Sequence, residues 1–335
     1  MNKNVLAILL VSILVVSGCV QVDTSIKEPI KIGIDVFPGW AHFFIAEEKG
    51  YFEKNGVNVE IVLNEDYLTI QDQFANNELD GAFMVYADAI YANDQGLDVR
   101  VVYISDHSIT GDVIAAKPEF NRLEDLKGKK ISVEGINSFS HLFVLSVLEK
   151  NGMKEGDIFI ENIGAQEVVA ALEKGDIVAG HTYGPGKTKA REKGYVYLAY
   201  AGDVKGIITD TLAFHKKTTK ERPDEVKAIV KSLFEAKKFQ ETNREEALQI
   251  LAKAISDTPE SIGIGIDAVE YVDLKDNLTS MLPMEQHKKH GEGFVHLLDA
   301  GKIISDFFIS RGQISKLPDF DKLIEDSFVK ELLNE

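Results

Sequence analysis

A cluster of polar side chains near the middle of the chain could bind a ligand. The segment Gly135-Ile136-Asn137-Ser138-Phe139-Ser140-His141 follows the strand-like run 131–133 and opens a helix-like run. Free N–H groups in the first turn of a helix bind anions, and the hydroxyls of Ser138 and Ser140 can add donors. An N-cap role would explain one serine but not the whole cluster. We therefore predict that Ser138, Phe139, Ser140 and His141 contact a ligand, with His141 as a neutral hydrogen-bond partner.

Aromatic side chains stand at two other strand ends. Trp40, the only Trp in the chain, comes after the first strand-like run and directly follows a Gly. Its indole could anchor the core or stack on a planar or cationic solute, and the sequence leaves both possibilities open. Tyr86 follows the run 81–85 and is a second predicted ligand contact. Nearby Asp88 fits compensation of the helix dipole better than ligand binding.

Three further candidates lie elsewhere in the chain. Thr110 could reach a cleft or belong to a plain turn, Tyr183 follows the strand-like run 177–181, and Asp210 could be a hinge carboxylate or an anchor for a cationic group. None of the selected segments contains the Arg or Lys expected in a sulfonate or nitrate site. The set favours a small polar or aromatic heterocycle, although backbone N–H groups could still hold an anion.

Other chemistries find little support in the sequence. His287, His290 and His296 could be drawn as a metal site, but Lys288 and Lys289 would oppose a cation, so a solvated helix face is the better interpretation. The chain has no G-x-S-x-G, no phosphate loop and no HExxH. We predict neither a metal, nor a cofactor, nor an enzymatic activity.

The candidates need strands and helices that bring them together. Two series of alternating strand-like and helix-like runs predict an α/β fold with two Rossmann-like lobes and mostly parallel sheets. The extended runs 112–116 and 207–214 are the predicted crossings, and helices follow Pro223. We expect residues 30–111 and 207–335 to form the first lobe, residues 112–206 to form the second, and the ligand cleft to lie between them.

The N-terminus has the pattern of an export signal. Lys3 precedes the apolar run 5–16, which is too short to span a bilayer. We predict a signal peptide over residues 1–18. Val16-Ser17-Gly18-Cys19 is similar to the lipobox of prokaryotic lipoproteins, and Cys19 is the only cysteine in the chain. The resemblance implies acylation of Cys19, with residues 19–29 as a tether to the outer face of the cell membrane; an ordinary secretory signal is the alternative.

Composition narrows the function further. The chain has 335 residues, 44% of them hydrophobic, and carries 37 Lys and Arg against 54 Asp and Glu. This acidic balance repels phosphate backbones, so we predict no nucleic-acid binding. Without a second cysteine the chain forms no internal disulfide, and packing must supply its stability.

Several blocks resemble the extracytoplasmic solute-binding proteins of ABC transporters, in the subgroup that binds sulfonates, taurine, nitrate and thiamine precursors. They are Gly39-Trp40, Ala46-Glu47-Glu48-Lys49-Gly50-Tyr51-Phe52, Asp80-Gly81-Ala82-Phe83, Leu126-Lys127-Gly128-Lys129-Lys130-Ile131 and Phe307-Phe308 with Gly312-Gln313-Ile314. Relatives often carry an acid where this chain has Gly184, which weakens any transfer of their substrates. The resemblance implies the type II periplasmic binding protein fold, a monomer, and a permease and ATPase as partners.

The expected function is therefore capture of a small solute by closure of two hinged lobes, followed by delivery to a permease. The ligand would be a thiamine-precursor pyrimidine or similar heterocycle, or else a sulfonate, taurine or nitrate. Two alternatives remain open: a ligand-sensing lipoprotein coupled to signalling, and an enzyme like those of the same fold that build the thiamine pyrimidine. The Cys-rich active motif of those enzymes has no counterpart here.

Overall fold

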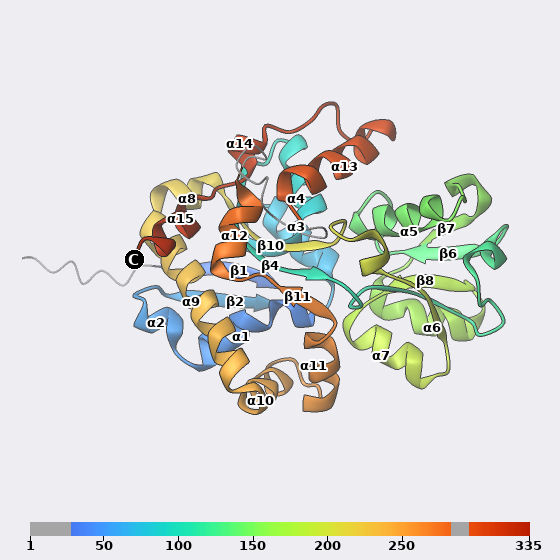
Figure 1. Cartoon of the computed structure of the whole chain (residues 1–335), viewed down its shortest axis with the longest axis horizontal. Helices are drawn as coiled ribbons and strands as arrows, with labels where there is room; N and C mark the ends of the chain where they lie inside the picture. The colour runs from blue at the N-terminus through green and yellow to red at the C-terminus, as the bar shows by residue number, and fades with distance from the viewer. Residues whose placement is uncertain (1–27, 283–294) are drawn as a thin grey trace, which may run out of the picture.

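The chain forms two separate sheets, each covered by helices, and we refer to each sheet with its helices as a lobe (Figure 1). The computed structural model describes residues 28–282 and 295–335. The first sheet has the order β11-β4-β10-β3-β1-β2 and the second the order β7-β6-β8-β5-β9. The strands of the first sheet are β1 Ile30–Ile34, β2 Val59–Leu63, β3 Gly81–Val85, β4 Val99–Ser108, β10 Thr209–His215 and β11 Val269–Tyr271. Those of the second are β5 Val113–Ala116, β6 Lys130–Val133, β7 Phe159–Asn162, β8 Ala179–Thr182 and β9 Val196–Tyr200.

Helices cover both faces of each sheet (Figure 1). The second lobe carries α5 Phe139–Lys150 on one face, and α6 Val168–Lys174 and α7 Gly184–Glu192 on the other. The first lobe carries α1 Ala41–Glu48, α2 Tyr51–Lys54, α3 Tyr67–Ala75, α4 Tyr86–Asp94, α8 Lys216–Glu221, α9 Pro223–Thr242, α10 Arg244–Ala254, α11 Pro259–Ile266, α12 Leu274–Met281, α13 Leu297–Ser310, α14 Phe320–Leu323 and α15 Ser327–Leu333. Strands such as β3, β4 and β5 are buried along their whole length because both sheet faces are covered.

The predicted α/β architecture is confirmed, but the sheets are mixed instead of mostly parallel. In the first sheet β1, β2 and β3 are parallel, whereas β10 is antiparallel to both β3 and β4. In the second sheet β6, β7 and β8 are parallel, and β5 is antiparallel to β8 and β9. β5 and β10 each begin where the chain has just crossed from the other lobe. Because β5 and β10 start at the junction between the lobes, they run away from it. Their neighbours β3, β4 and β8 end at the junction and therefore run in the opposite direction.

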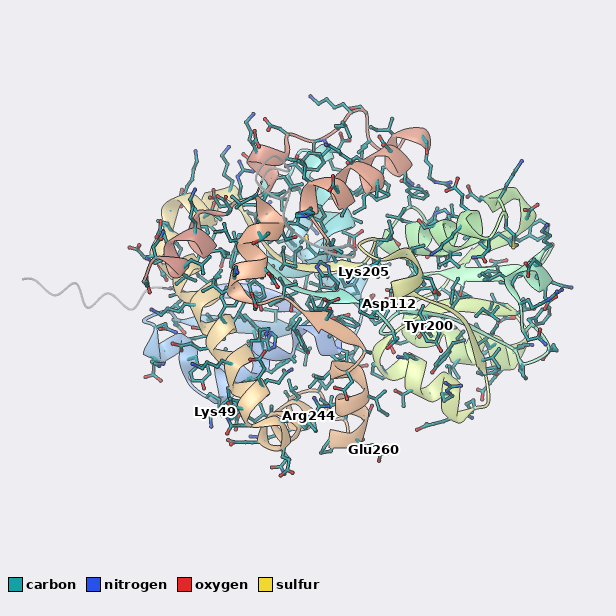
Figure 2. The ribbon with its side chains drawn as sticks, in the orientation of Figure 1. Lys49, Asp112, Tyr200, Lys205, Arg244 and Glu260 are labelled. Carbon is teal, nitrogen blue, oxygen red and sulfur yellow. The ribbon has the colours of Figure 1, made fainter. Side chains whose placement is uncertain are left out.

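The crossings lie earlier in the chain than predicted. The expected crossings 112–116 and 207–214 lie mostly within strands, because β5 belongs to the second sheet and β10 to the first. The chain passes between the sheets in the segments 109–112 and 201–208, which separate the flanking strands. Figure 2 shows Asp112, Tyr200 and Lys205 at this junction. An ion pair also joins the lobes, since Arg311 after α13 donates to Glu155 beside the second sheet, with Nη2 and Oε1 2.8 Å apart.

Local backbone rules explain several element ends. The predicted helix over residues 42–52 is broken at Gly50, whose φ of 66° gives the left-handed conformation that a glycine adopts without strain. Lys49 is the C-cap of α1, so Gly50 occupies the C′ position, as predicted. Pro223 is the first residue of α9, also as predicted, and Asp224 and Glu225 follow it in the first turn.

Other elements differ from the sequence prediction. The predicted helix over residues 286–298 lies mostly outside the described residues, and α13 begins only at Leu297. The predicted last helix near residues 319–333 is two helices, α14 and α15. β7, β11, α11 and α12 were not predicted, because their three to eight residues are too few to show a clear period.

Some predictions concern residues that the structure does not describe. The signal peptide, Cys19, most of the tether, His287 and His290 all lie outside the described ranges. Within residues 28–282 and 295–335, no helix combines the length and the apolar character that a membrane crossing needs. The same residues contain no group of His, Cys, Asp and Glu side chains suited to a metal ion.

Candidate ligand-binding site

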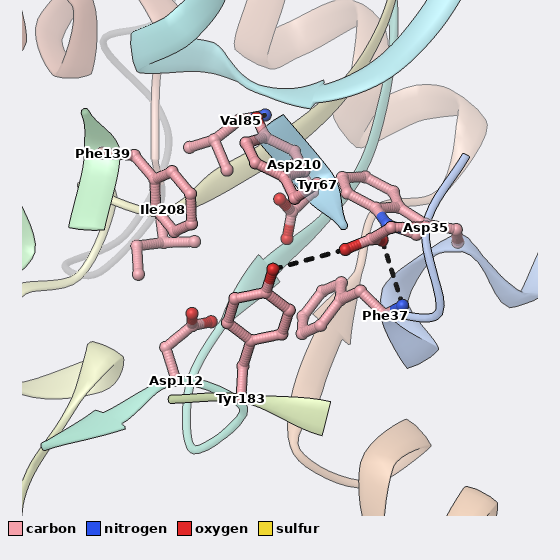
Figure 3. A pocket seen from close by; sticks show the side chains of 10 residues that line it. Asp35, Phe37, Tyr67, Val85, Asp112, Phe139, Tyr183, Ile208 and Asp210 are labelled. Atoms are coloured by element: carbon pink, nitrogen blue, oxygen red, sulfur yellow. Dashed lines mark hydrogen bonds between the residues drawn. The ribbon is translucent and has the colours of Figure 1, made fainter. Parts of the chain in front are cut away.

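A small cavity lies between the two lobes, where strands and crossings end (Figure 3). The first lobe contributes the turn after β1, the end of β3, the start of α3 and the start of β10. The second lobe contributes the start of α5 and the residue after β8. The lining residues are Asp35, Phe37, Trp40, Tyr67, Val85, Asp112, Phe139, Tyr183, Ile208 and Asp210. The cavity of about 10 Å³ has room for roughly one water molecule, so the lobes must separate to admit a metabolite.

Carboxyl groups dominate the polar lining. Asp35, Asp112 and Asp210 line the cavity, and each is at most 2% exposed. Asp106 pairs with Asp210 across strands β4 and β10. Neither Lys nor Arg is among the ten lining residues. The site is therefore acidic and largely shielded from water.

Asp35 is held in place by two donors from its own turn and by a contact with the second lobe. Its Oδ1 accepts from the backbone N–H of Phe37 at 3.0 Å and from the indole N–H of Trp40. Its Oδ2 lies 3.4 Å from the hydroxyl of Tyr183 in the second lobe. Burial raises the pKa of Asp35 to about 6, against the opposing effect of these hydrogen bonds.

Tyr183 connects Asp35 with a second buried acid. Its hydroxyl donates to Oε2 of Glu134 at 2.9 Å, and Oε1 of Glu134 accepts from the backbone N–H of Ala165 at 3.1 Å. Burial raises the pKa of Glu134 to about 7. A phenol has a single proton to donate, so one of the two carboxyls that flank it gains by carrying a proton itself.

Asp112 belongs to a relay with a histidine and a serine. His181 Nε2 lies 2.9 Å from Asp112 Oδ1, and His181 Nδ1 lies 2.7 Å from the hydroxyl of Ser140. A carboxylate can only accept, so Nε2 carries the proton, and Nδ1 of the neutral ring accepts from Ser140. The Ser140 oxygen in turn accepts from the N–H of Glu134 at 2.8 Å. The relay thus fixes one oxygen of Asp112, while its Oδ2 has no partner among the described residues.

The Asp106 and Asp210 carboxyls form a buried like-charge pair. Burial raises the pKa of Asp106 to about 7. Burial, followed by repulsion from Asp106 and Asp112, raises the pKa of Asp210 well above its ordinary value. Gly39 allows this close packing, because a Cβ at that position would stand 2.4 Å from Asp106 Oδ2.

Aromatic rings form the apolar walls. The Phe37 ring lies edge-on to Trp40 and to Tyr183, with centroids 5.5 and 5.7 Å apart. On the opposite lobe Phe139 packs edge-on against Tyr67 at 5.4 Å. Rings in this arrangement suit the packing of a flat or cationic group.

The structure places six of the nine predicted ligand residues at the cavity or next to it. Trp40, Phe139, Tyr183 and Asp210 line the cavity. Ser140 lies one step behind it and acts on Asp112 through His181. Ser138 caps α5, with its hydroxyl accepting from the N–H of Ser140 at 3.1 Å, and it lines a neighbouring cavity beside Asp88.

The other three predicted residues do not line this cavity. His141 Nδ1 accepts from the N–H of Asn137 at 3.0 Å and its Nε2 lies 3.4 Å from Glu155, so the ring faces the interlobe ion pair. Tyr86 is fully buried inside the first lobe, close to Gly301. The Thr110 carbonyl accepts from Nζ of Lys187.

Asp88 occupies the predicted anion site at the start of α5. Its carboxyl accepts from the Tyr67 hydroxyl at 2.6 Å and from the backbone N–H of Phe139. The acid belongs to the first lobe and the N–H to the second. Compensation of the α4 dipole, the role predicted for Asp88, does not include this contact with the other lobe. An anion at the start of α5 would have to displace the Asp88 carboxylate.

Sequence reasoning missed Asp35, Asp112, Glu134 and His181. A signal was present for two of them, because Asp35 directly follows β1 and Glu134 directly follows β6. Polar residues at the carboxyl ends of strands in α/β folds commonly face a ligand crevice. Asp35 and Glu134 each precede a Gly-rich or aromatic turn, and the prediction assigned ligand contacts to the turn and not to the acid.

Known proteins resemble this chain over most of its length. A protein of Brucella abortus (strain 2308) with a provisional binding-protein name is 28% identical over 307 residues, which cover 90% of this chain and 91% of that protein. The alkanesulfonate-binding protein SsuA of Xanthomonas axonopodis pv. citri, bound to MOPS, superposes with a TM-score of 0.72 at 16% identity, covering 90% of this chain and 99% of the other. The periplasmic nitrate-binding protein NrtA of Synechocystis PCC 6803 also gives a TM-score of 0.72 at 16% identity, covering 91% of this chain and 88% of the other.

These structural likenesses confirm the predicted periplasmic binding protein fold. The family model described as NMT1/THI5 like matches residues 38–247. The match includes Trp40, both crossings and the whole second lobe, and it contains eight of the ten residues that line the cavity. Since it covers well over half of the sequence, the chain belongs to the NMT1/THI5-like family.

Proposed function

We propose that this protein is the extracytoplasmic substrate-binding subunit of an ABC importer, which encloses a small solute between its lobes and passes it to a permease. The observation that carries the proposal is the interlobe cavity, to which both lobes contribute buried polar groups. Family membership and the fold shared with sulfonate- and nitrate-binding proteins support it. The solute would stabilise the closed form by contacting both lobes at once.

The proposed ligand contacts are Trp40, Phe139, Tyr183 and Asp210, joined by Asp35 and Asp112. The functional lobes would be residues 30–111 with 207–335 and residues 112–206, with the crossings as hinge. Tyr183 would report closure, since its hydroxyl contacts Asp35 of the first lobe and Glu134 of the second.

The orientation of the Ser140-His181-Asp112 relay supports binding without turnover. In nucleophilic catalysis the serine faces the substrate and the acid stands behind the histidine. Here Asp112 lines the cavity, while Ser140 is fully buried and already accepts a hydrogen bond from a backbone N–H. We therefore assign the relay to positioning Asp112.

Closure can be followed with two fluorophores. Because Cys19 is the only cysteine, a secreted Cys19→Ser chain can be labelled at Phe159→Cys and Ile303→Cys, two exposed positions on different lobes. We expect a solute of the right class to shift single-molecule energy transfer towards the closed population. The control pair Phe159→Cys and Lys193→Cys, both in the second lobe, should not respond. A broad panel of sulfonates, nitrate, pyrimidines, flavins and amines that moved neither pair would contradict the proposed function.

Anchoring through Cys19 is a separate proposal. The lipobox-like sequence before Cys19 supports acylation, and two or more acyl chains give stable membrane anchoring. In a bacterial host, we expect the full chain to incorporate radiolabelled palmitate and to sediment with membranes, and Cys19→Ala to lose both properties. Equal labelling of the two chains would refute the anchor and leave the binding function untouched.

A further inference from the structure

Two carboxyl oxygens at the cavity have no hydrogen-bond partner among the described residues. They are Oδ2 of Asp112 and Oδ2 of Asp210, and both residues line the cavity while less than 3% exposed. Buried oxygens of this kind are costly unless a donor reaches them. Asp112 sits on the first crossing and Asp210 just after the second, so a group placed between them would touch both hinge segments.

The other two acids that contact Tyr183 have partners, whereas both oxygens of Asp106, which does not line the cavity, also lack one among the described residues. Asp35 Oδ1 accepts from Phe37 and Trp40, Glu134 accepts from Ala165 and Tyr183, and Asp35 Oδ2 lies 3.4 Å from the Tyr183 oxygen. His181 fixes the other oxygen of Asp112. Among the carboxyls that line the cavity, only those of Asp112 and Asp210 therefore have an oxygen without a partner among the described residues.

No basic side chain of the described residues lines the cavity to meet this demand. Lys187 is close enough to interact electrostatically with Asp112, but its Nζ donates to the Thr110 carbonyl and it lines a separate cavity beside Pro38. The first-turn N–H of α5 that would hold an anion is taken by Asp88. The lining thus favours a cation and disfavours an anion.

We infer that the solute is an organic cation, a protonated amine or amidinium on a flat ring, whose N–H groups donate to Asp112 and Asp210 while the ring lies between Phe37, Tyr67 and Phe139. This inference rests on the proposed function and names its substrate class. It separates this chain from the sulfonate- and nitrate-binding proteins that share its fold, whose ligands are anions.

The paired acids give the cation a defined electrostatic role. Repulsion between Asp106 and Asp210 favours a shared proton when no cation is near. A bound ammonium or amidinium supplies the positive charge instead, so the shared proton can leave to solvent. A quaternary ammonium has charge but no N–H, and it would leave both free oxygens without a hydrogen bond.

The test uses small probes matched in shape. Benzamidine and benzylamine are the cations with N–H groups, trimethylphenylammonium is the cation without them, and benzyl alcohol is the neutral analogue. Benzoate, benzenesulfonate and nitrate are the anions. Calorimetry and thermal shift of the full secreted chain should show binding of benzamidine or benzylamine at least tenfold tighter than that of every other probe. Binding of an anion or of benzyl alcohol at equal or higher affinity would overturn the inference.

Two variants locate the binding site. Asp112→Asn keeps an oxygen for His181 but points an amide donor into the cavity, and we expect at least a tenfold loss of affinity for the cationic probe. Asp210→Asn should also weaken binding, while Asp176→Asn on the exposed surface of the second lobe should not. Circular dichroism and the melting temperature establish whether each variant folds. Unchanged affinity in both folded cavity variants would overturn the inference.

Failure of this inference can be told apart from failure of the proposed function. If the energy-transfer pair closes on a neutral or anionic solute, the chain is a binding protein and the cation assignment is wrong. If no solute closes it, the proposed function itself fails, and the cation assignment with it.

Discussion

Replacing Trp40 with alanine is expected to lower the free energy of unfolding by about 3–5 kcal/mol, the usual cost of truncating a large buried aromatic side chain. Trp40 is only 2% exposed, and its ring packs against Phe37 and, with centroids 5.0 Å apart, against Phe83. The truncation would also remove the indole donor from Asp35. Core anchor and ligand contact, the two roles that the sequence left open, are compatible in this structure because one indole packs in the core and lines the cavity.

A Trp40→Phe variant separates packing from hydrogen bonding. It retains most of the buried apolar surface but leaves Oδ1 of Asp35 without the indole N–H, so we expect a loss of about 1–3 kcal/mol. Urea unfolding followed by circular dichroism measures both variants, since neither retains a Trp for fluorescence. If Trp40→Phe proves as damaging as Trp40→Ala, the hydrogen bond dominates; if Trp40→Ala costs under 1 kcal/mol, the packing role is wrong.

The second large effect is a loss of stability as pH rises from 7 to 8.5 in the absence of solute. Burial raises the pKa of Glu134 and of Asp106 to about 7, and it raises that of Asp210 well above its ordinary value. A carboxyl with a raised folded-state pKa binds more protons in the folded than in the unfolded chain, so stability present at low pH is lost as pH rises through that pKa. A carboxyl whose folded-state pKa is near 7 contributes a loss of about 0.4 kcal/mol over this interval and about 1.3 kcal/mol between pH 6 and 8.

Buried histidines act in the opposite direction at lower pH. Burial lowers the pKa of His42 to about 3 and of His107 to about 4, and also lowers those of His141 and His215. Their unfolded forms take up protons below about pH 6.5, which destabilises the folded chain on acidification. Above pH 7 the unfolded histidines bind few protons, so the carboxyls dominate the pH dependence of stability there.

Urea midpoints measured every half pH unit test this profile. Glu134→Gln removes one of the titrating carboxyls and should flatten the decline above pH 7. The matched control Glu192→Gln, at an exposed site on α7, should leave the decline unchanged. A midpoint that rises between pH 7 and 8.5 would show that these carboxyls are ionised without penalty.

The sequence predicted the elements that have strong periods. The predicted alternation of strands and helices between residues 30 and 199 appears in the structure, apart from the missed β7 and the helix divided at Gly50. Strands such as β1, β3 and β6 were predictable because they are largely buried and therefore apolar. The direction of β5 and β10 could not be predicted in this way. Strand direction depends on the side from which the chain enters the sheet, and that follows from the crossings.

The candidate site was predictable only where a residue type marks it. Trp40, Phe139, Tyr183 and Asp210 stood out as aromatic or acidic residues at strand ends, and they line the cavity. His141 follows Ser140 directly, yet consecutive helix residues point about 100° apart, so it faces Glu155 instead. His181 and Ser140 lie 69 and 28 positions after Asp112 in the chain. Only the tertiary fold brings His181 to Asp112, and Ser140 to His181.

The placement of β10 has a consequence for the order of folding. β10 lies between β3 and β4, so the first sheet cannot be completed until residue 215 is available. The second lobe is one continuous stretch whose ends meet where Val113 pairs with Tyr200, and all its contacts within the sheet lie inside that stretch. We expect the inserted lobe to fold first and the first lobe to close around β10 afterwards, as sequence separation sets the cost of pairing. A chain that folds as it emerges from its N-terminus would thus expose the inner edges of β3 and β4 until β10 is available, and the outer edge of β4 until β11 pairs with it.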